Sequence, residues 1–113
     1  MIDWARVLVL REEVGAKDFA EVVDLFLDEV QEALLRLQGP MTADQFEAEL
    51  HFLKGSALNL GFAAFADLCE AEERQASAGQ NPAGCIPALR SCYARSRAVF
   101  LKELPQKLAP TAA

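Results

Sequence analysis

Apolar residues recur along the chain at intervals of three and four, the spacing of one face of an α-helix. The longest such stretch runs from about 17 to 38 and has these apolar positions: Phe19, Val23, Phe26, Val30, Leu34 and Leu37. A second stretch has the positions Phe46, Leu50, Leu53, Ala57 and Leu60. No segment shows the sustained alternation of apolar and polar residues that a half-buried strand would have. The pattern therefore predicts an all-α fold.

Residues that favour helix ends divide this pattern into separate helices. Asp3 can cap a short first helix that ends near Val14, because the glycine at Gly15 favours a helix terminus. The dipeptide Gly39-Pro40 ends the second helix, since proline cannot continue a helix from that position. We therefore expect a first helix over about 3–14.

The third predicted helix has the strongest start signal in the chain. Thr42 and Gln45 have the spacing of a capping box, in which each side chain bonds the backbone N–H of the other residue. Met41 and Phe46 occupy the flanking positions where two apolar side chains often pack together. Gly61 suits the position just after the helix, where a left-handed backbone is common.

Two further helices follow. The fourth begins directly after Gly61 and fades at Ala78-Gly79, and residues 80–84 are predicted to form a loop. The last helix is expected to run from about 85 or 86 to Leu104, where Pro105 would stop it. The tail over 105–113 is expected to be frayed.

Four long amphipathic helices with short connections predict an antiparallel up-down-up-down four-helix bundle. The bundle would span about 17–104, and the helix at 3–14 would lie across one end as a lid. With 113 residues, 52% of them hydrophobic, the chain is expected to form a single domain over 1–113 with its own core.

Charge and composition exclude several classes of function. The net charge of −6 argues against nucleic acid and against anionic membrane surfaces as partners. No apolar run approaches the length of a membrane span, and no basic segment precedes an apolar run as in a signal peptide. We therefore expect a cytoplasmic protein.

The sequence lacks the residues that a metal site or a cofactor site usually needs. It has three cysteines, no CxxC pair and one histidine, which is too little for a usual zinc ligand set. No strand is predicted that could support a phosphate-binding loop. We expect neither a metal nor a cofactor, and the cysteines read as small apolar residues on helix faces.

The single histidine, His51, carries the candidate chemistry. On a helical wheel it lies about 140° from the centre of the apolar stripe of its helix, so it should face solvent. Glu47, Lys54, Gly55 and Leu58 fall on the same face. A glycine inside a helix costs about 1 kcal/mol relative to alanine, which makes sense if a bulky group must reach the imidazole. Lys54 could hold an anion there.

The stretch from His51 to Ala57, with Leu60-Gly61 and Leu68-Cys69, closely resembles the signature of the histidine-containing phosphotransfer (HPt) family, roughly H-x-L-K-G-[SA]-[SA]-x-x-[LI]-G. The resemblance implies a four-helix bundle in which His51 is transiently phosphorylated. It implies that the chain relays phosphoryl groups between aspartates of response-regulator receiver domains, including those of hybrid sensor kinases.

The family resemblance extends to one more residue. In the family, a Gln or Glu about 22 positions after the histidine hydrogen-bonds the imidazole from the next helix, and Glu73 holds that position here. Its height on the bundle agrees, because His51 precedes Gly61 by ten residues and Glu73 follows it by twelve.

The sequence contains no nucleotide-binding element. We therefore expect a phosphocarrier that acts as a monomer and has no kinase activity of its own.

Each of these residues also has a plainer interpretation. His51 and Lys54 can be ordinary surface side chains, Gly55 can serve close helix packing, and Glu73 can belong to a solvated acidic run. The alternative function is a non-catalytic helical interaction module that binds or inhibits a receiver or a sensor kinase without phosphotransfer. The chain can also be an excised domain of a hybrid kinase.

An apolar patch beside His51 is predicted to dock the partner. Leu58 is its best candidate, because it is apolar on the face of the histidine, where a soluble bundle would prefer a polar residue. The predicted patch is Leu58, Asn59, Phe62, Phe19 and Val22. For Phe19, Val22 and Phe62, partial burial under the lid helix is the alternative.

Overall fold

The protein is described here by a computed structural model, which covers residues 1–79 and 82–108, with the side chains of residues 82 and 83 left out. Within these ranges the chain forms five α-helices, one short 3-10 helix and no strand. The elements are α1 (Trp4–Val14), α2 (Phe19–Arg36), α3 (Ala43–Leu60), α4 (Ala63–Ser77), η1 (Pro82–Cys85) and α5 (Ile86–Leu108). The predicted all-α class is confirmed.

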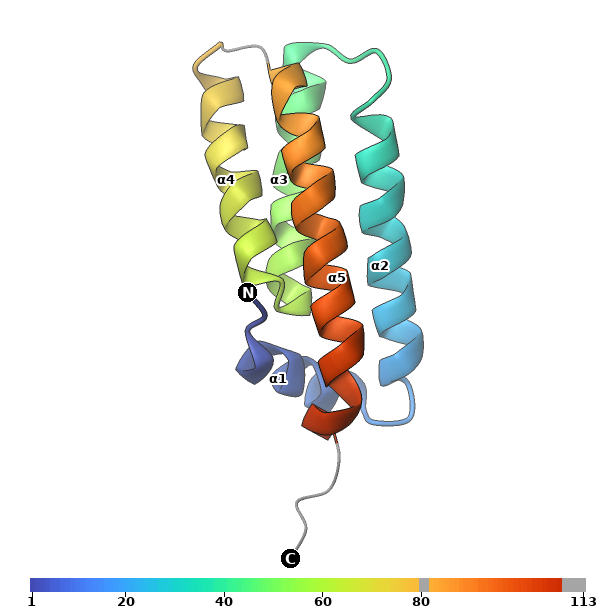
Figure 1. The fold of residues 1–113 in the computed structure, drawn as a ribbon. Coiled ribbons are helices and arrows are strands. Elements are labelled where there is room, and N and C mark those ends of the chain that lie inside the picture. The colour runs from blue at the N-terminus through green and yellow to red at the C-terminus, as the bar shows by residue number, and fades with distance from the viewer. Residues whose placement is uncertain (80–81, 109–113) are drawn as a thin grey trace, which may run out of the picture.

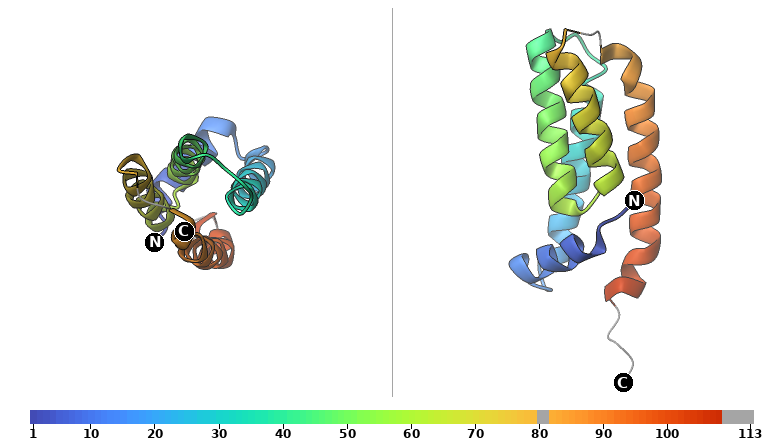
Figure 2. Two further views of the ribbon diagram at one scale, coloured as in Figure 1. Left: turned by 90° about the horizontal axis from the view of Figure 1, so that it is seen from above. Right: turned by 90° about the vertical axis from the view of Figure 1, so that its left-hand side faces the viewer.

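The four long helices, α2 to α5, run side by side, and the chain reverses direction from each one to the next (Figure 1). Seen from above, they follow one another around a common axis, so that α5 lies diagonally across from α3 (Figure 2). The short helix α1 lies across the end where α3 turns into α4 (Figure 1). This arrangement leaves the outer face of α3 open.

The core lies between these helices and is built from the apolar stripes that the sequence predicts. All five stripe residues of α3 are buried, and five of the six on α2 are, with Phe26 only partly covered. Aromatic residues fill the end nearest α1. Phe62 packs against Phe100 with 5.2 Å between ring centroids, and Trp4 of α1 stacks on Phe100 at 5.6 Å. The amphipathic pattern thus decides which side of each helix faces inward.

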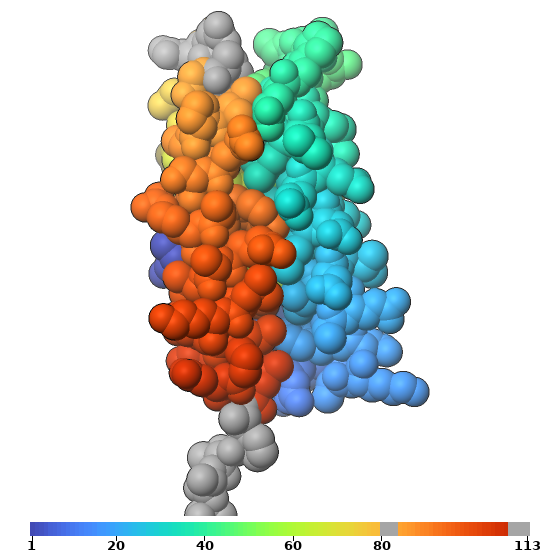
Figure 3. Space-filling view, turned by 45° about the vertical axis from the view of Figure 1, so that its right-hand side comes forward, coloured from blue at the N-terminus to red at the C-terminus, as the bar shows by residue number. Residues whose placement is uncertain are grey.

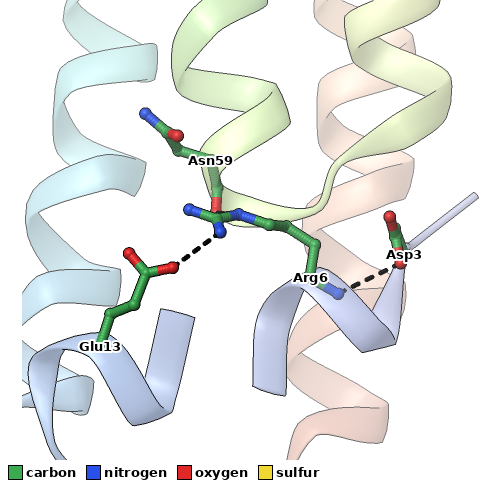
Figure 4. A network of polar contacts seen from close by, with 4 residues as sticks. All are labelled: Asp3, Arg6, Glu13 and Asn59. Atoms are coloured by element: carbon green, nitrogen blue, oxygen red, sulfur yellow. Dashed lines mark hydrogen bonds and ion pairs between the residues drawn. The ribbon is translucent and has the colours of Figure 1, made fainter. Parts of the chain in front are cut away.

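Polar contacts hold α1 against the end of α3 (Figure 4). The Asp3 carboxylate accepts a hydrogen bond from the Arg6 backbone N–H at 3.2 Å, which caps α1 as predicted. The Arg6 guanidinium donates through Nε to the Asn59 carbonyl oxygen at 3.2 Å and pairs with Glu13 at 2.9 Å. The Asp3 backbone N–H donates to the Gly61 carbonyl at 2.7 Å. These contacts satisfy backbone groups that the end of α3 would otherwise leave open.

Gly61 lies where the residues of α1 and its N-cap approach the end of α3 closely. Its φ of 82° lies in the left-handed region, which a glycine adopts without a steric penalty. A Cβ at this position would stand 2.7 Å from the Asp3 carbonyl oxygen and 2.8 Å from Val7 Cγ2. The prediction that Gly61 follows the end of α3 is confirmed, and the close approach of α1 is a second reason for glycine there. The capping box of Thr42 and Gln45 is also present.

One predicted helix boundary is wrong, and part of a predicted loop is helical. Pro105 does not end the last helix, because α5 continues to Leu108 with the proline inside it. Packing outweighs the lost backbone hydrogen bond here, since Leu104 and Leu108 both pack against the core. Residues 82–84 of the predicted loop belong to the 3-10 helix η1, which extends to Cys85, while residues 80 and 81 lie outside the described part. Of the predicted frayed tail, 109–113 also lie outside it.

Candidate functional site

The imidazole of His51 stands near the middle of α3 and points away from the core, with 70% of its side chain exposed. Its Nδ1 lies 2.8 Å from Oε1 of Glu73, which comes from the adjacent helix α4. The predicted pairing of these two residues is therefore present in the structure. The pairing exists because the chain reverses direction at Gly61 between α3 and α4, which brings residues at similar distances from the turn side by side.

Glu73 divides its two carboxylate oxygens between two partners. Oε1 faces His51, and Oε2 lies 3.2 Å from the ammonium Nζ of Lys54. Oε2 is buried and has no well-aligned hydrogen bond, so the Lys54 ion pair is its contact. The Glu73 side chain is only 17% exposed. Burial acts to raise the pKa of Glu73, but the contacts with His51 and Lys54 outweigh it, and the pKa lies below its ordinary value.

The ionised Glu73 carboxylate orients the histidine ring. A carboxylate can only accept hydrogen bonds, so Nδ1 must carry a hydrogen to bond it. In the neutral ring this tautomer places the free lone pair on Nε2, the nitrogen farther from Glu73. A lone pair on an exposed nitrogen with its ring held from behind is the arrangement of a surface nucleophile.

Gly55 lies one helical turn after His51 and leaves open space beside it. A Cβ at Gly55 would meet no atom within 4 Å apart from the helix's own nearby backbone. The alternative that Gly55 serves close helix packing is therefore wrong. Nothing in the described part of this chain requires a glycine there. The neighbouring Ser56 is buried and structural.

A shallow hollow beside His51 is lined by Asp44, Glu47 and Ala48 together with His51 and Glu73. The sequence analysis placed Glu47 on the face of His51 but did not name Asp44. Asp44 precedes His51 by seven residues, which is the helical spacing of one face and the signal that could have found it. Glu47 also accepts a hydrogen bond from the Ser77 hydroxyl on α4.

Comparison with known proteins identifies the family. A family model described as Hpt domain matches residues 21–99, which is most of the chain. This chain belongs to the Hpt domain family. Membership implies histidine phosphotransfer in phosphorelay signalling, with receiver domains as the class of partner. Comparisons with curated proteins and with solved structures found no match.

The predicted docking patch of this Hpt domain needs correction at two positions. Phe19 and Phe62 are only 3% and 1% exposed, so they cannot contact a partner. Phe62 belongs to the aromatic cluster under α1, and Phe19 begins α2 inside the core. The alternative of burial is correct for these two. Leu58 is 53% exposed, Asn59 is exposed and Val22 is partly exposed, so docking through these three residues stays a prediction.

Two further apolar side chains on this side of the Hpt domain were missed. Phe52 follows His51 directly and is 41% exposed. Leu25 is 56% exposed and lines a shallow hollow on α2 together with Val22, Phe26 and Glu29. This hollow borders α3, because Val22 and Glu29 share the face of α2 from which Arg36 reaches Glu49 of α3 at 2.6 Å. Both could have been found in the sequence, because each is an apolar residue that lies outside the core stripe of its helix.

In residues 1–79 and 82–108, no helix is long and apolar enough to cross a membrane. The same residues contain no cluster of His, Cys, Asp or Glu that could hold a metal ion. The three cysteines are free, and burial raises the pKa of Cys69 to about 12, so this thiol stays protonated and unreactive at neutral pH.

Proposed function

We propose that this Hpt domain is a phosphorelay intermediate that carries a phosphoryl group on Nε2 of His51 between receiver-domain aspartates in a two-component signalling pathway. The observation that carries the proposal is the array of His51, Glu73 and Lys54 across α3 and α4. It combines an exposed ring, a carboxylate 2.8 Å behind that ring and a cation 3.2 Å from the same carboxylate.

The transfer step follows from this geometry. The Nε2 lone pair attacks the phosphorus of a receiver's aspartyl phosphate, a P–N bond forms, and the bond from phosphorus to the aspartate oxygen breaks. The aspartate leaves as a carboxylate. The ring keeps its hydrogen on Nδ1 and gains positive charge, which the Glu73 carboxylate stabilises. Return transfer to a second receiver reverses each bond change, so the carrier ends as it began.

Lys54 and Gly55 have supporting roles in this proposal. The Lys54 ammonium holds Glu73 in place and adds positive charge near the developing phosphohistidine. Gly55 leaves the space through which the receiver's pocket reaches the ring. A nucleophile on a convex surface cannot exclude water by itself, so transfer takes place only inside the complex with the receiver.

The receiver is proposed to dock on the apolar side chains around His51. The corrected docking patch consists of Leu58, Asn59, Val22, Phe52 and Leu25. These residues lie on α2 and α3, which together form the outer face next to the histidine. The scaffold in this proposal is an antiparallel four-helix bundle with α1 as its lid, which acts as a monomer in the cytoplasm.

The proposed protein is a phosphocarrier without kinase activity of its own, and its receivers include those of hybrid sensor kinases. The alternative function, an interaction module that binds or inhibits a receiver or sensor kinase without phosphotransfer, makes no use of the His51–Glu73–Lys54 array. No observation favours it.

A phosphotransfer assay tests the proposal. The chain is incubated with a panel of phosphorylated receiver domains, and acid-labile label on it is followed. We expect label on the native chain and none on His51→Gln. Because the His51 side chain is 70% exposed, the variant should keep its helicity and melt essentially as the native chain does.

Ser91→Gln is the matched control, since Ser91 is exposed on α5, away from the site. This variant should accept label like the native chain. Label remaining on His51→Gln would show that His51 is not the only acceptor. A native chain that binds receivers but takes no label from any of them would favour the interaction module instead.

A further inference from the structure

A groove runs between α2 and α5, on the side of the bundle away from the outer face of α3. In Figure 3 it follows the seam between the orange surface of α5 and the teal surface of α2. Its apolar lining comes from both helices. Leu34 and Tyr93 are buried at its base, and Leu35 is 65% exposed. Ala94 and Ala98 are the small residues on the side of α5, and they leave room above them.

Polar residues line both edges of this groove. Arg90 and Arg97 are seven residues apart on α5, whereas Gln31 is on α2 and Gln38 lies in the turn that follows α2. All four are exposed. Seven residues advance about 10.5 Å along a helix and return to nearly the same face. Arg90 and Arg97 therefore lie on one face of α5 at the spacing of one heptad, which also separates residues on one face of a helix lying along the groove.

The charge of α5 is opposite to that of the rest of the chain. It carries five of the eleven basic residues and one of the seventeen acidic ones, whereas the remaining chain has six basic and sixteen acidic residues. Neither Arg90 nor Arg97 forms an ion pair with any residue that the structure describes. Two exposed, unpaired arginines on an acidic protein are complementary to an acidic partner.

We propose that this groove binds an acidic amphipathic helix of a partner protein. Leucines of that helix would lie over Leu35, Ala94 and Ala98, and carboxylates one heptad apart would pair with Arg90 and Arg97. The amides of Gln31 and Gln38 would bond polar groups on its other side. Because α5 lies diagonally across from α3, the groove and His51 can be occupied together. The groove thus serves as an anchoring site, and the inference does not depend on the role of His51.

The test uses a synthetic peptide of about 21 residues, three heptads long, with leucines at two positions of each heptad and glutamates flanking them. Binding to the full chain is followed by titration and by shifts of backbone amide NMR signals. We expect the shifts to gather on 31–38 and 90–98 and to leave the signals around His51 unchanged. Affinity should fall as salt is raised, because charge pairs contribute to it.

Charge reversal makes the test specific. The double variant Arg90→Glu, Arg97→Glu should bind the peptide at least about tenfold more weakly, and a peptide with lysines in place of the glutamates should bind this variant instead. Arg95→Glu is the matched control, because Arg95 is an exposed arginine of the same helix that does not line the groove. It should bind the acidic peptide nearly as the native chain does.

Several results would overturn the proposal. One is the absence of peptide binding to the native chain at about millimolar concentration, where even weak helix docking is measurable. Another is an equal loss of affinity in Arg95→Glu, which would mean general charge attraction. A third is shifts that gather around His51. Self-association of the free chain that the double arginine variant abolishes would assign the groove to a second copy instead.

Discussion

At the scale of single residues, Glu73 links the two functional side chains of the site. One of its oxygens bonds the ring of His51 and the other pairs with Lys54, so one partly buried carboxylate contacts both side chains. The ionised form of Glu73 is the form that makes these contacts, which is why its pKa is lowered despite burial. Its protonation should therefore affect both stability and transfer.

Glu73→Gln tests this coupling through pH. A group whose folded pKa is lowered stabilises the fold fully above its ordinary pKa, here 4.5, and loses that contribution as the pH falls through the folded value. The native chain should thus have a larger free energy of unfolding than Glu73→Gln at neutral pH. The difference should shrink below about pH 4.5, as measured by urea unfolding at a series of pH values. A difference that does not change with pH would contradict the assignment.

Gly55 should show opposite effects on stability and on transfer. Gly55→Gln adds a side chain at an exposed helix position with open space around it, so it should stabilise the fold by up to about 1 kcal/mol. It should also slow phosphotransfer strongly, because the new side chain occupies the approach to His51. A melt paired with a transfer rate checks both effects. Unchanged transfer would remove the steric argument.

At the scale of elements, the turn between α3 and α4 sets the register of the site. His51 and Glu73 meet because Gly61 ends α3 and Phe62 immediately precedes α4. The helix α1 packs on this turn, and its backbone approaches Gly61 too closely for any side chain. The stability of the turn therefore depends on its contact with α1, the N-terminal helix, which is distant from the turn in the sequence.

Gly61→Ala should be markedly destabilising. An alanine at this position would adopt a left-handed backbone at a cost of about 1–2 kcal/mol, and its Cβ would clash with the Asp3 carbonyl and with Val7. Gly79→Ala is the matched control, because Gly79 has the same φ of 82° but nothing within 4 Å of an added Cβ. We expect the loss at Gly61 to exceed the loss at Gly79 in urea unfolding, with Trp4 fluorescence reporting α1. Equal losses would mean that the approach of α1 contributes nothing.

At the scale of the whole molecule, the Hpt domain presents two different faces. One, formed by α2 and α3, has His51 and exposed apolar residues. The other, between α2 and α5, has the groove edged by two arginines. Since α3 and α5 lie diagonally across the bundle, a partner on one face need not obstruct the other (Figure 2).

Leu58→Asp tests the first of these faces. Leu58 is 53% exposed, so the change should leave the bundle folded, but a carboxylate there should weaken receiver binding by more than tenfold, or about 1.4 kcal/mol. His51 should still react with a small phosphodonor. Leu101→Asp is the control, because Leu101 is a 41% exposed leucine on α5, away from His51. If receiver binding survives the change at Leu58, the docking face lies elsewhere.

Much of the fold and of the candidate site was predictable from local sequence. Helical periodicity, the capping box at Thr42 and the glycine at Gly61 depend on residues a few positions apart, so they predict helices and their ends without knowledge of packing. His51, Lys54 and Gly55 share one helix face for the same reason. Glu73 was predicted through the family resemblance, and its distance from Gly61 agrees with an antiparallel turn between the two helices.

The tertiary structure decided which residues of the predicted docking patch are covered. Phe19 and Phe62 were both placed in that patch, yet both are buried. Phe19 follows the apolar stripe of its helix into the core, and Phe62 packs against Phe100 of α5, which is distant in the sequence. Pro105 fails to end α5, because packing of Leu104 and Leu108 against the core outweighs a local preference. The groove between α2 and α5 could likewise be found only in the tertiary structure, because two helices that are distant in the sequence form it. Local interactions determine helices and their faces, whereas burial depends on contacts that sequence spacing does not contain.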